Sequence, residues 1–154
     1  YESLQFPYMA ANNYMADISE LRLVNGVQQA WLKTLMQWVC VLPAENIFLL
    51  NVNTVTEENA AILASMANLS ISDAKSIIAS RPPDGFQNAA DFLALTQVTA
   101  ANLTDEQKAW FTVTTDYFML SSKTSYNNAS FAMQTLFKVE NNQVSVKKRQ
   151  FGIQ

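Results

Sequence analysis

The apolar residues in the first part of the chain recur at helical spacing. Between residues 28 and 39 they fall at i, i+1, i+4, i+5 and i+8, the broad stripe of a helix that faces a core. Pro43 follows and cannot continue a helix. The pattern predicts a helix near 28–39, ended by Pro43, whose core face consists of Trp31, Leu32, Leu35, Met36 and Val39.

Polar residues mark the start of an earlier helix. Asp17 and Glu20 have the spacing of a capping box, and Asn25-Gly26 is a typical helix end in the left-handed conformation. Residues 1–16 are rich in aromatic residues and Asn, so we expect an ordered loop whose Tyr, Phe and Met side chains pack against other residues.

Short helices separated by turns are predicted between residues 56 and 111, after a buried extended segment at 46–53. Pro82 and Pro83 stop the helix that begins at a Ser72 cap, and Thr104 and Gln107 form a second capping box. One predicted helix starts near Thr56 and the next at Ser72, and two more span 89–95 and 104–111. The residues expected to face inward on the first two are Ile62, Leu63, Met66, Ala74, Ile77 and Ile78.

The pattern changes near residue 113 to β-branched and aromatic residues with imperfect alternation. Strands are predicted at 114–124, 129–139 and 143–151, separated by Asn-rich turns. Helices followed by an antiparallel meander indicate an α+β fold. We expect a helical domain over 1–113, with sub-lobes of about 1–43 and 44–113, and a small sheet over 114–154.

Composition removes several kinds of chemistry. The 154 residues include no histidine, three isolated glycines and one cysteine, Cys40. This excludes Ser-His-Asp and Cys-His catalysis, His-bound or Cys-cluster metal sites, phosphate loops of clustered glycines, and an internal disulfide. Carboxylate catalysis and oxygen-ligated calcium remain open. Apolar residues make up 49% and charged residues 15%, which excludes a highly charged disordered chain.

The charge balance is mildly acidic, with a net charge of −3 and a pI of about 4.8, so we expect no nucleic-acid partner. No apolar run approaches the roughly 18 residues that span a bilayer, and no signal segment is visible. Because the chain starts at Tyr1 rather than Met, we expect a processed chain or a fragment of a longer protein.

Several segments, in their order along the chain, closely resemble the K minor pseudopilin family of type II secretion systems. They are SELRLVNGV, WLKTLMQWVCVLP, an NVNT turn before a helix, and a helix that ends in Arg81 before a Pro/Gly-rich turn and a short helix containing Phe. The resemblance covers nearly the whole chain. The matching motif residues, which we expect to be structural, are Asn51, Asn53, Thr54, Arg81, Gly85, Phe86 and Phe92.

The resemblance implies a pilin-type sheet that carries a large SAM-like or helix-hairpin-helix-like insertion. In the family an apolar N-terminal helix, pilin strands and a first helical lobe precede the region matched here. It also implies a non-enzymatic subunit that caps the pseudopilus tip and helps start its assembly with the I and J minor pseudopilins. The major pseudopilin, the secretin and the exported substrate are further implied partners. The implied location is the periplasm of a Gram-negative bacterium, with an inner-membrane anchor in the full-length protein.

Individual polar residues have simpler interpretations. We expect Asn51 and Asn53 to shape a turn, and Arg81 to cap helix carbonyls or pair with an Asp. Adjacent carboxylates such as Glu57-Glu58 point about 100° apart on a helix, so they suit the helix dipole better than acid–base catalysis. Cys40 lies among aliphatic residues and is predicted to be buried. The resemblance makes calcium a possible ligand, without identifying its ligands.

The one basic run, at residues 147–149, lies in a predicted strand. Alternation predicts that Lys147 and Arg149 share one face and Lys148 the other, on a solvated strand edge. As basic residues that can meet an acidic partner or acidic lipid, Lys147 and Arg149 are the candidate partner surface. We place partner contacts on the sheet of 114–154, because the resemblance implies that this sheet lies nearest the family's N-terminal helix, through which pilin-like subunits pack. Two alternatives stay open: a helix-hairpin-helix module over 61–95 that binds nucleic acid, and a carboxylate-dependent hydrolase acting on a glycan.

Overall fold

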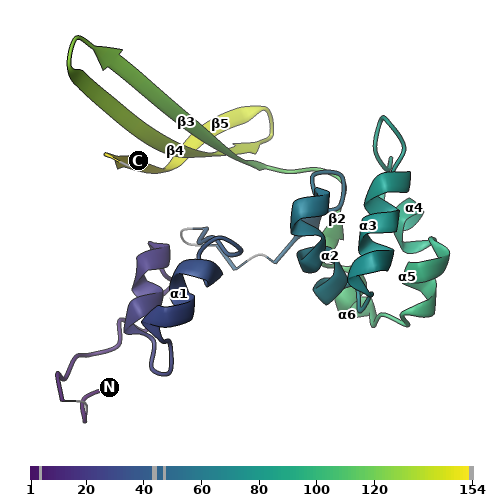
Figure 1. Ribbon diagram of the computed structural model, residues 1–154, viewed down its shortest axis with the longest axis horizontal. Coiled ribbons are helices and arrows are strands. Elements are labelled where there is room, and N and C mark those ends of the chain that lie inside the picture. Colours follow the sequence, from purple (N-terminus) through teal and green to yellow (C-terminus); the bar gives the residue numbers. More distant parts are fainter. Residues whose placement is uncertain (4, 43–44, 47, 153–154) are drawn as a thin grey trace. The chain divides into compact units, whose positions relative to one another are not determined.

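The computed structural model describes residues 1–3, 5–42, 45–46 and 48–152 (Figure 1). The chain divides into two compact units, Tyr1–Ile47 and Phe48–Gln154. Helices come first and a three-stranded antiparallel sheet follows, so the predicted α+β class is confirmed. No helix in the described ranges has both the length and the apolar character needed to cross a membrane.

The first unit contains two short helices. The 3₁₀-helix η1 (Ile18–Leu23) begins at the predicted Asp17 capping box, which forms with both of its hydrogen bonds. Helix α1 (Gln29–Leu35) is shorter than predicted, because its last turn tightens into i→i−3 hydrogen bonds from Gln37 and Trp38. It therefore ends well before Pro43, which lies outside the described residues.

Little of the first unit is buried. Leu32 is buried and Leu35 and Met36 are half-buried, but Trp31 and Val39 are exposed, so the predicted stripe buries fewer side chains than expected. The expectation that the aromatic N-terminal segment packs is also wrong for Phe6 and Met9, which are 80% and 83% exposed. Cys40 is exposed rather than buried because it follows α1 in a segment without regular structure.

Residues 48–113 form a helical module. The predicted extended segment before it is reduced to β1 (Leu50–Asn51), and Phe48 and Leu49 are exposed rather than buried. Strand β1 pairs in parallel with β2 (Phe111–Thr112), which replaces the end of the helix predicted at 104–111. The two ends of the module are thereby held side by side.

The module's helices follow the predicted order with two differences. Helix α3 is capped by Ser70, whose hydroxyl accepts from the backbone N–H of Asp73, and not by Ser72. Helix α5 was not predicted. The elements are η2 (Glu57–Asn59), α2 (Ala60–Met66), α3 (Ile71–Ser80), α4 (Ala89–Leu93), α5 (Thr96–Ala100) and α6 (Asp105–Lys108), the last with its predicted Thr104–Gln107 capping box.

These helices enclose one hydrophobic core. Phe92, which is 0% exposed, contacts the rings of Phe86 and Phe111 at centroid distances of 5.9 and 5.0 Å. Leu63 and Ile77 are buried as predicted, whereas Ile62, Met66 and Ile78 are half-buried. The other buried members are Val52, Val55, Ala60, Ala64, Ala67, Ala74, Val98 and Leu103.

The sheet is an antiparallel meander, as predicted. It consists of β3 (Tyr117–Tyr126), β4 (Ala129–Glu140) and β5 (Gln143–Phe151), in the spatial order β3-β4-β5 (Figure 1). The turns use Asn127, Asn141 and Asn142 with positive φ, a conformation that Asn tolerates better than most residues. Strands β3 and β5 are the edges of this sheet.

Candidate protein interface

The side chain of Asn53 joins three segments of the helical module. Its amide nitrogen donates to the carbonyl oxygens of Phe86 (3.0 Å) and Val113 (3.3 Å), and its amide oxygen accepts from the backbone N–H of Phe86 (2.8 Å). Asn51 shapes the turn before it, since its side-chain oxygen accepts from the N–H of Asn53 at 2.9 Å. The asparagines thus shape a turn, as expected, and Asn53 also holds the exit of the module.

Arg81 has a different role from the one predicted. Its guanidinium donates to the carbonyl oxygens of Val52 and Val55, each at 2.9 Å. These carbonyls belong to the turn before η2, so Arg81 ties the end of α3 to that turn instead of capping helix carbonyls. Val52 and Val55 are buried, and these two hydrogen bonds give their backbone carbonyl oxygens a partner.

The remaining motif residues support the same arrangement. Gly85 has a φ of +75°, and a Cβ there would lie 2.8–2.9 Å from the side-chain atoms of Asn53. Thr54 donates its hydroxyl to the carbonyl of Asn51 at 3.0 Å, while Phe86 and Phe92 lie in the core. In this structure the motif therefore organises the module, and its residues do not form an exposed binding surface.

The sheet has two unlike faces. Side chains alternate along a strand and cross-strand partners share a face, so the register assigns each residue. One face, which we name the apolar face, has exposed large hydrophobic side chains on all three strands. Its main members are Phe118 and Leu120 of β3, Phe131, Met133, Thr135, Phe137 and Val139 of β4, and Val144, Val146, Arg149 and Phe151 of β5.

The opposite face is mixed and more polar, and we name it the polar face. Its members include Lys138 beside Ser145, and Gln134 between Ser121 and Gln150. Leu136 is buried there and has Lys148 as its cross-strand partner. The unlike faces are typical of an antiparallel sheet that packs on one side and meets water on the other.

A bulge in β5 changes the predicted position of the basic run. Leu136 pairs with Lys148, but the next residue, Phe137, pairs with Val146, so Lys147 is the extra residue that forms the bulge. Simple alternation therefore does not extend from Arg149 to Lys147. The register places Arg149 on the apolar face and Lys148 on the polar face. Lys147 lies on the edge strand, as predicted.

The two parts of the chain differ in charge sign. Residues 1–113 contain five basic and eleven acidic residues, a net charge of −6, whereas residues 114–154 contain five basic and two acidic residues, a net charge of +3. A basic sheet with an exposed apolar face is suited to a protein partner with apolar and acidic groups. This combination makes the sheet the candidate interface.

The helix-hairpin-helix geometry does occur, with α2 and α3 joined by a turn in which Asn68 has a φ of +54°. Its charge does not suit a phosphate backbone, however. Of the two basic residues between 44 and 100, Arg81 is held by backbone carbonyls and Lys75 is exposed, and the same range contains six acidic residues. Nucleic-acid binding rests chiefly on such phosphate contacts, so this alternative is disfavoured.

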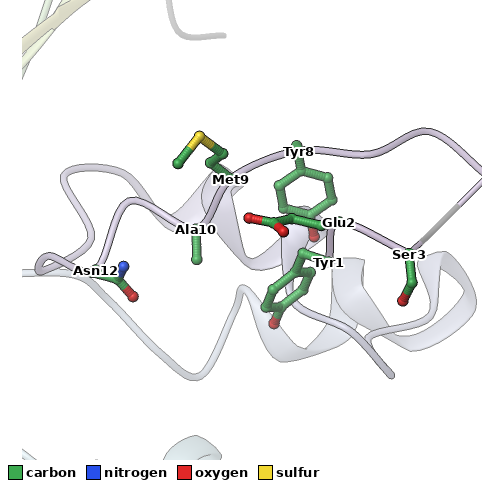
Figure 2. Close-up of a pocket in the computed structure, with 7 residues that line it drawn as sticks. All are labelled: Tyr1, Glu2, Ser3, Tyr8, Met9, Ala10 and Asn12. Carbon is green, nitrogen blue, oxygen red and sulfur yellow. The ribbon is translucent and has the colours of Figure 1, made fainter.

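A pocket of about 490 Å³ lies in the N-terminal segment (Figure 2). Tyr1 and Tyr8 both line it, with ring centroids 5.0 Å apart. The pKa of Tyr8 is raised, first because its hydroxyl is partly shielded from water and second because Tyr1 lies next to it. Glu2 is the one carboxylate among its lining residues, and a second pocket lined by Leu93, Asn102 and Lys108 has none. Neither holds the two facing carboxylates that a glycan hydrolase requires.

Calcium, which the resemblance implies, is bound in proteins by six to eight oxygen ligands. Within the ranges that the structure describes, no group of three or more Asp, Glu, Cys or His side chains is arranged to hold a metal ion. We therefore assign no calcium ligands in this chain.

The sequence predicted the strands and, from the alternation at 129–139, a sheet with unlike faces, but it did not assign residues of the neighbouring strands to the apolar face. The alternation of Phe131, Met133 and Phe137 was visible, and combining it with Phe118 and Leu120 would have indicated one apolar face. The bulge at Lys147 left no such signal, because nothing in QVSVKKRQF specifies where the pairing slips. The position of Arg149 on the apolar face was therefore accessible only from the structure.

Comparison with protein families gives two matches, and both families are described as type II secretion system protein K. One family model matches residues 50–114 and the other matches residues 1–44. Together they leave residues 45–49 and the three-stranded sheet of residues 117–151 unmatched.

Curated relatives with the same description match over longer ranges. Type II secretion system protein K of Pectobacterium carotovorum subsp. carotovorum is 29% identical over 154 residues, which covers 99% of this chain and 46% of that protein. The Aeromonas hydrophila protein of the same name is 38% identical over 89 residues, covering 56% of this chain and 27% of its own length. The chain thus spans less than half the length of these relatives.

A solved structure matches the whole chain. It is the crystal structure of the GspK–GspI–GspJ complex from the type 2 secretion system of enterotoxigenic Escherichia coli. The matching chain is 28% identical and superimposes with a TM-score of 0.82, covering 100% of this chain and 54% of that one. Helices and sheet therefore occur in the same combination in both proteins.

Proposed function

Because the chain belongs to the protein K family of type II secretion systems, we propose that it is the periplasmic C-terminal part of a K minor pseudopilin that assembles with the I and J minor pseudopilins. The work of such a subunit is assembly and not catalysis. The observation that carries this proposal is the superposition of all 154 residues on one chain of a solved GspK–GspI–GspJ complex.

The family resemblance further suggests a role at the tip of the pseudopilus. A bulky helical domain on top of the subunit leaves no room for another pseudopilin above it. Such a subunit ends a filament that grows from below, and the complex with I and J is a natural starting point for that growth. The major pseudopilin, the secretin and the exported substrate are its further proposed partners.

We propose the periplasm of a Gram-negative bacterium as its location, with an inner-membrane anchor in the full-length subunit. The family's apolar N-terminal helix would supply that anchor. Pilin-like subunits pack through this helix, so the apolar face of the sheet is the natural surface for the rest of the subunit to cover.

We place the contacts with I and J on the sheet of 114–154, along the basic edge strand β5 that contains Lys147. Two features support this placement. The sheet carries a net charge of +3 while the helical part carries −6. Moreover, an edge strand presents unpaired backbone groups and side chains that a neighbouring subunit can contact.

The test is binding of this chain, and of a subunit extended to the length of its relatives, to a purified I–J pair by calorimetry and size-exclusion chromatography. We expect a complex that Lys147→Glu weakens at least tenfold, with a steeper loss in high salt. The matched control is Lys75→Glu at an exposed position of α3, which makes the same charge reversal in the helical module and should leave the affinity unchanged. No complex with the extended subunit would refute the proposed function.

The placement of the I and J contacts on the sheet can fail separately from the proposed function. If Lys147→Glu and other charge changes on the sheet leave the affinity unchanged while Lys75→Glu abolishes binding, the contacts lie on the helical module. Tip capping is tested separately by gold-labelling the subunit in assembled pseudopili. Label at one end of each filament supports capping, and label distributed along the filament contradicts it.

A further inference from the structure

The helical module contains the same hairpin twice. Residues 67–70 read Ala-Asn-Leu-Ser, and residues 101–104 read Ala-Asn-Leu-Thr. In each hairpin the Asn has a positive φ, +54° at Asn68 and +51° at Asn102, and the hydroxyl residue caps the next helix. The first hairpin joins α2 to α3 and the second joins α5 to α6. The second is a repeat of the first with shorter helices, since α3 has ten residues and α6 has four.

The short α6 ends beside a pocket. Four residues after its cap, the first hairpin has Ala74, which is fully buried. The corresponding residue of the second hairpin is Lys108, the last residue of α6, whose side chain is 47% exposed. A pocket of about 260 Å³ lies here, among the last turns of α4, α5 and α6, and its lining residues are Leu93, Val98, Thr99, Asn102, Leu103 and Lys108.

This pocket has an apolar floor and a polar mouth. Val98 and Leu103 are buried and Leu93 is half-buried, so these three side chains form the floor. Thr99, Asn102 and Lys108 are exposed and lie at the mouth. A largely apolar cavity with a few polar groups at its entrance is typical of a ligand site.

Two hydrogen bonds hold the polar groups of the mouth in place. The Thr99 hydroxyl donates to the carbonyl oxygen of Leu93 at 3.2 Å, which ties α5 to the end of α4. The Asn102 side-chain nitrogen donates to the carbonyl oxygen of Ala100 at 3.3 Å. An amide side chain also has a second N–H and an acceptor oxygen, which can bind a peptide group of a ligand.

Lys108 can exchange its present partner for a ligand. Its Nζ lies 2.8 Å from a carboxylate oxygen of Asp105, whose side chain is 98% exposed. Exposed ion pairs of this kind contribute little, because water and salt screen them. A carboxylate that apolar contacts hold at the pocket is better shielded from water, so it pairs more strongly with the ammonium group.

We propose that this pocket binds a leucine-like side chain of a partner peptide together with a carboxylate next to it. The apolar side chain lies on the floor, the carboxylate pairs with Lys108, and Asn102 contacts the peptide group between them. Such a carboxylate is either the C-terminus of the peptide or the side chain of a neighbouring Asp or Glu. The inference does not depend on the proposed function, because it concerns the helical module alone.

Volume and charge select this ligand. Pockets for small molecules and cofactors measure about 300–1,000 Å³, so this smaller pocket suits a single side chain. Lys108 is the one charged residue in its lining, and one cation matches one carboxylate, whereas a nucleic acid requires several cations. The C-terminal ends of α4, α5 and α6 oppose a carboxylate only weakly, because these helices have five, five and four residues.

The first test compares two charged ligands with their neutral counterparts. N-acetyl-leucine and N-acetyl-leucinamide differ in a terminal carboxylate, and N-acetyl-aspartyl-leucinamide and N-acetyl-asparaginyl-leucinamide differ in a side-chain carboxylate. Titration of the isotope-labelled chain, followed by the amide NMR signals, should show saturable shifts at Thr99, Asn102 and Leu103. At least one charged ligand should bind about tenfold more tightly than its counterpart, and which one it is identifies the source of the carboxylate.

Substitutions then test the site. Lys108→Met keeps the apolar stem and removes the charge, so it should abolish the advantage of the charged ligand and leave the affinity of the neutral one unchanged. Lys75→Met on α3 is the control and should change neither affinity. Thr99→Trp places a large ring at the mouth and should abolish binding, whereas Ser65→Trp, at the corresponding exposed position of the first hairpin, should not. The dispersion of the amide spectrum shows that each variant is folded.

Three results would overturn the proposal. If neither charged ligand binds more tightly than its neutral counterpart, the pocket does not recognise a carboxylate. If the advantage persists in Lys108→Met, another cation supplies it. If folded Thr99→Trp binds the ligands as tightly as the unmodified chain, they occupy a different part of the molecule.

Discussion

The helical module of residues 48–113 and the sheet of residues 117–151 handle their apolar residues in opposite ways. In the module, the rings of Phe86, Phe92 and Phe111 meet in a core that its own helices enclose. In the sheet, Phe118, Leu120 and Val146 are about half exposed on one face. The module thus encloses its apolar side chains, whereas the sheet leaves many of its own exposed.

The polar groups of the two regions also differ, in whether they have hydrogen-bond partners. In the module, Asn53 and Arg81 together make five hydrogen bonds to backbone groups of distant segments. In the sheet, the buried Thr135 hydroxyl has no partner among the described residues. A satisfied network rigidifies the module, whereas the buried hydroxyl of Thr135 without a partner costs the sheet free energy.

The largest expected difference between the two regions comes from removing one ring in each. Phe92→Ala should lower the free energy of unfolding by about 3–5 kcal/mol, because it leaves a cavity in an enclosed core. Phe118→Ala, at a residue 47% exposed, should cost less than about 1 kcal/mol. Urea unfolding followed by circular dichroism measures both, and similar losses for the two variants would refute the comparison.

Gly85 offers the next test, within the module. Gly85→Ala should lower the free energy of unfolding by about 2–3 kcal/mol, because it combines a φ of +75° with a Cβ 2.8–2.9 Å from the Asn53 amide. The matched control is Gly26→Ala, with a φ of +89° and open space around it, which should cost about 1 kcal/mol from backbone strain. Equal costs would mean that the close approach to Asn53 contributes nothing.

A third, smaller effect concerns Asn53 itself. Asn53→Ala leaves the backbone groups of Phe86 and the carbonyl of Val113 without their partner, so we expect a loss of about 1–3 kcal/mol. In this background Gly85→Ala should cost less than it does alone, because the amide atoms that the new Cβ would meet are gone. Additive losses in the double-mutant cycle would show that the two residues are independent.

The parts of the fold that the sequence predicts well depend on local chemistry. Both capping boxes form as expected because every group in them lies within three residues. The three strands were recognised from alternation and Asn-rich turns. Ser70 and Ser72 are equally good caps on sequence, and the structure uses Ser70, which the hairpin after α2 brings into place. Local pattern alone does not decide between them.

The parts that were missed depend on contacts between distant residues. The β1–β2 pair joins residues about 60 positions apart, and each strand is two residues long, too short to show a period. The motif residues were identified through family resemblance, but Asn53 was assigned only to its own turn, and its bonds reach Phe86 and Val113. Cys40 and Phe6 were predicted to pack because they are apolar, and the first unit encloses too little space for them.

The smallest expected effect comes from the exposed ion pair of the module. Lys108 lies 2.8 Å from Asp105 one turn away, and its hydrogen bond and charge lower the pKa of that carboxyl below its usual value. A lowered pKa in the folded state stabilises the fold above the unfolded-state pKa, and that contribution is lost as the pH falls through the folded value. Because Asp105 is almost fully exposed, solvent screens the pair and the stability should change little. Lys108→Ala should therefore raise the carboxyl titration midpoint of Asp105, measured by NMR, while the unfolding midpoint in urea stays nearly constant. This result would mean that the stability of the module depends on its core and not on its surface charges. A large loss of stability in Lys108→Ala would contradict that conclusion.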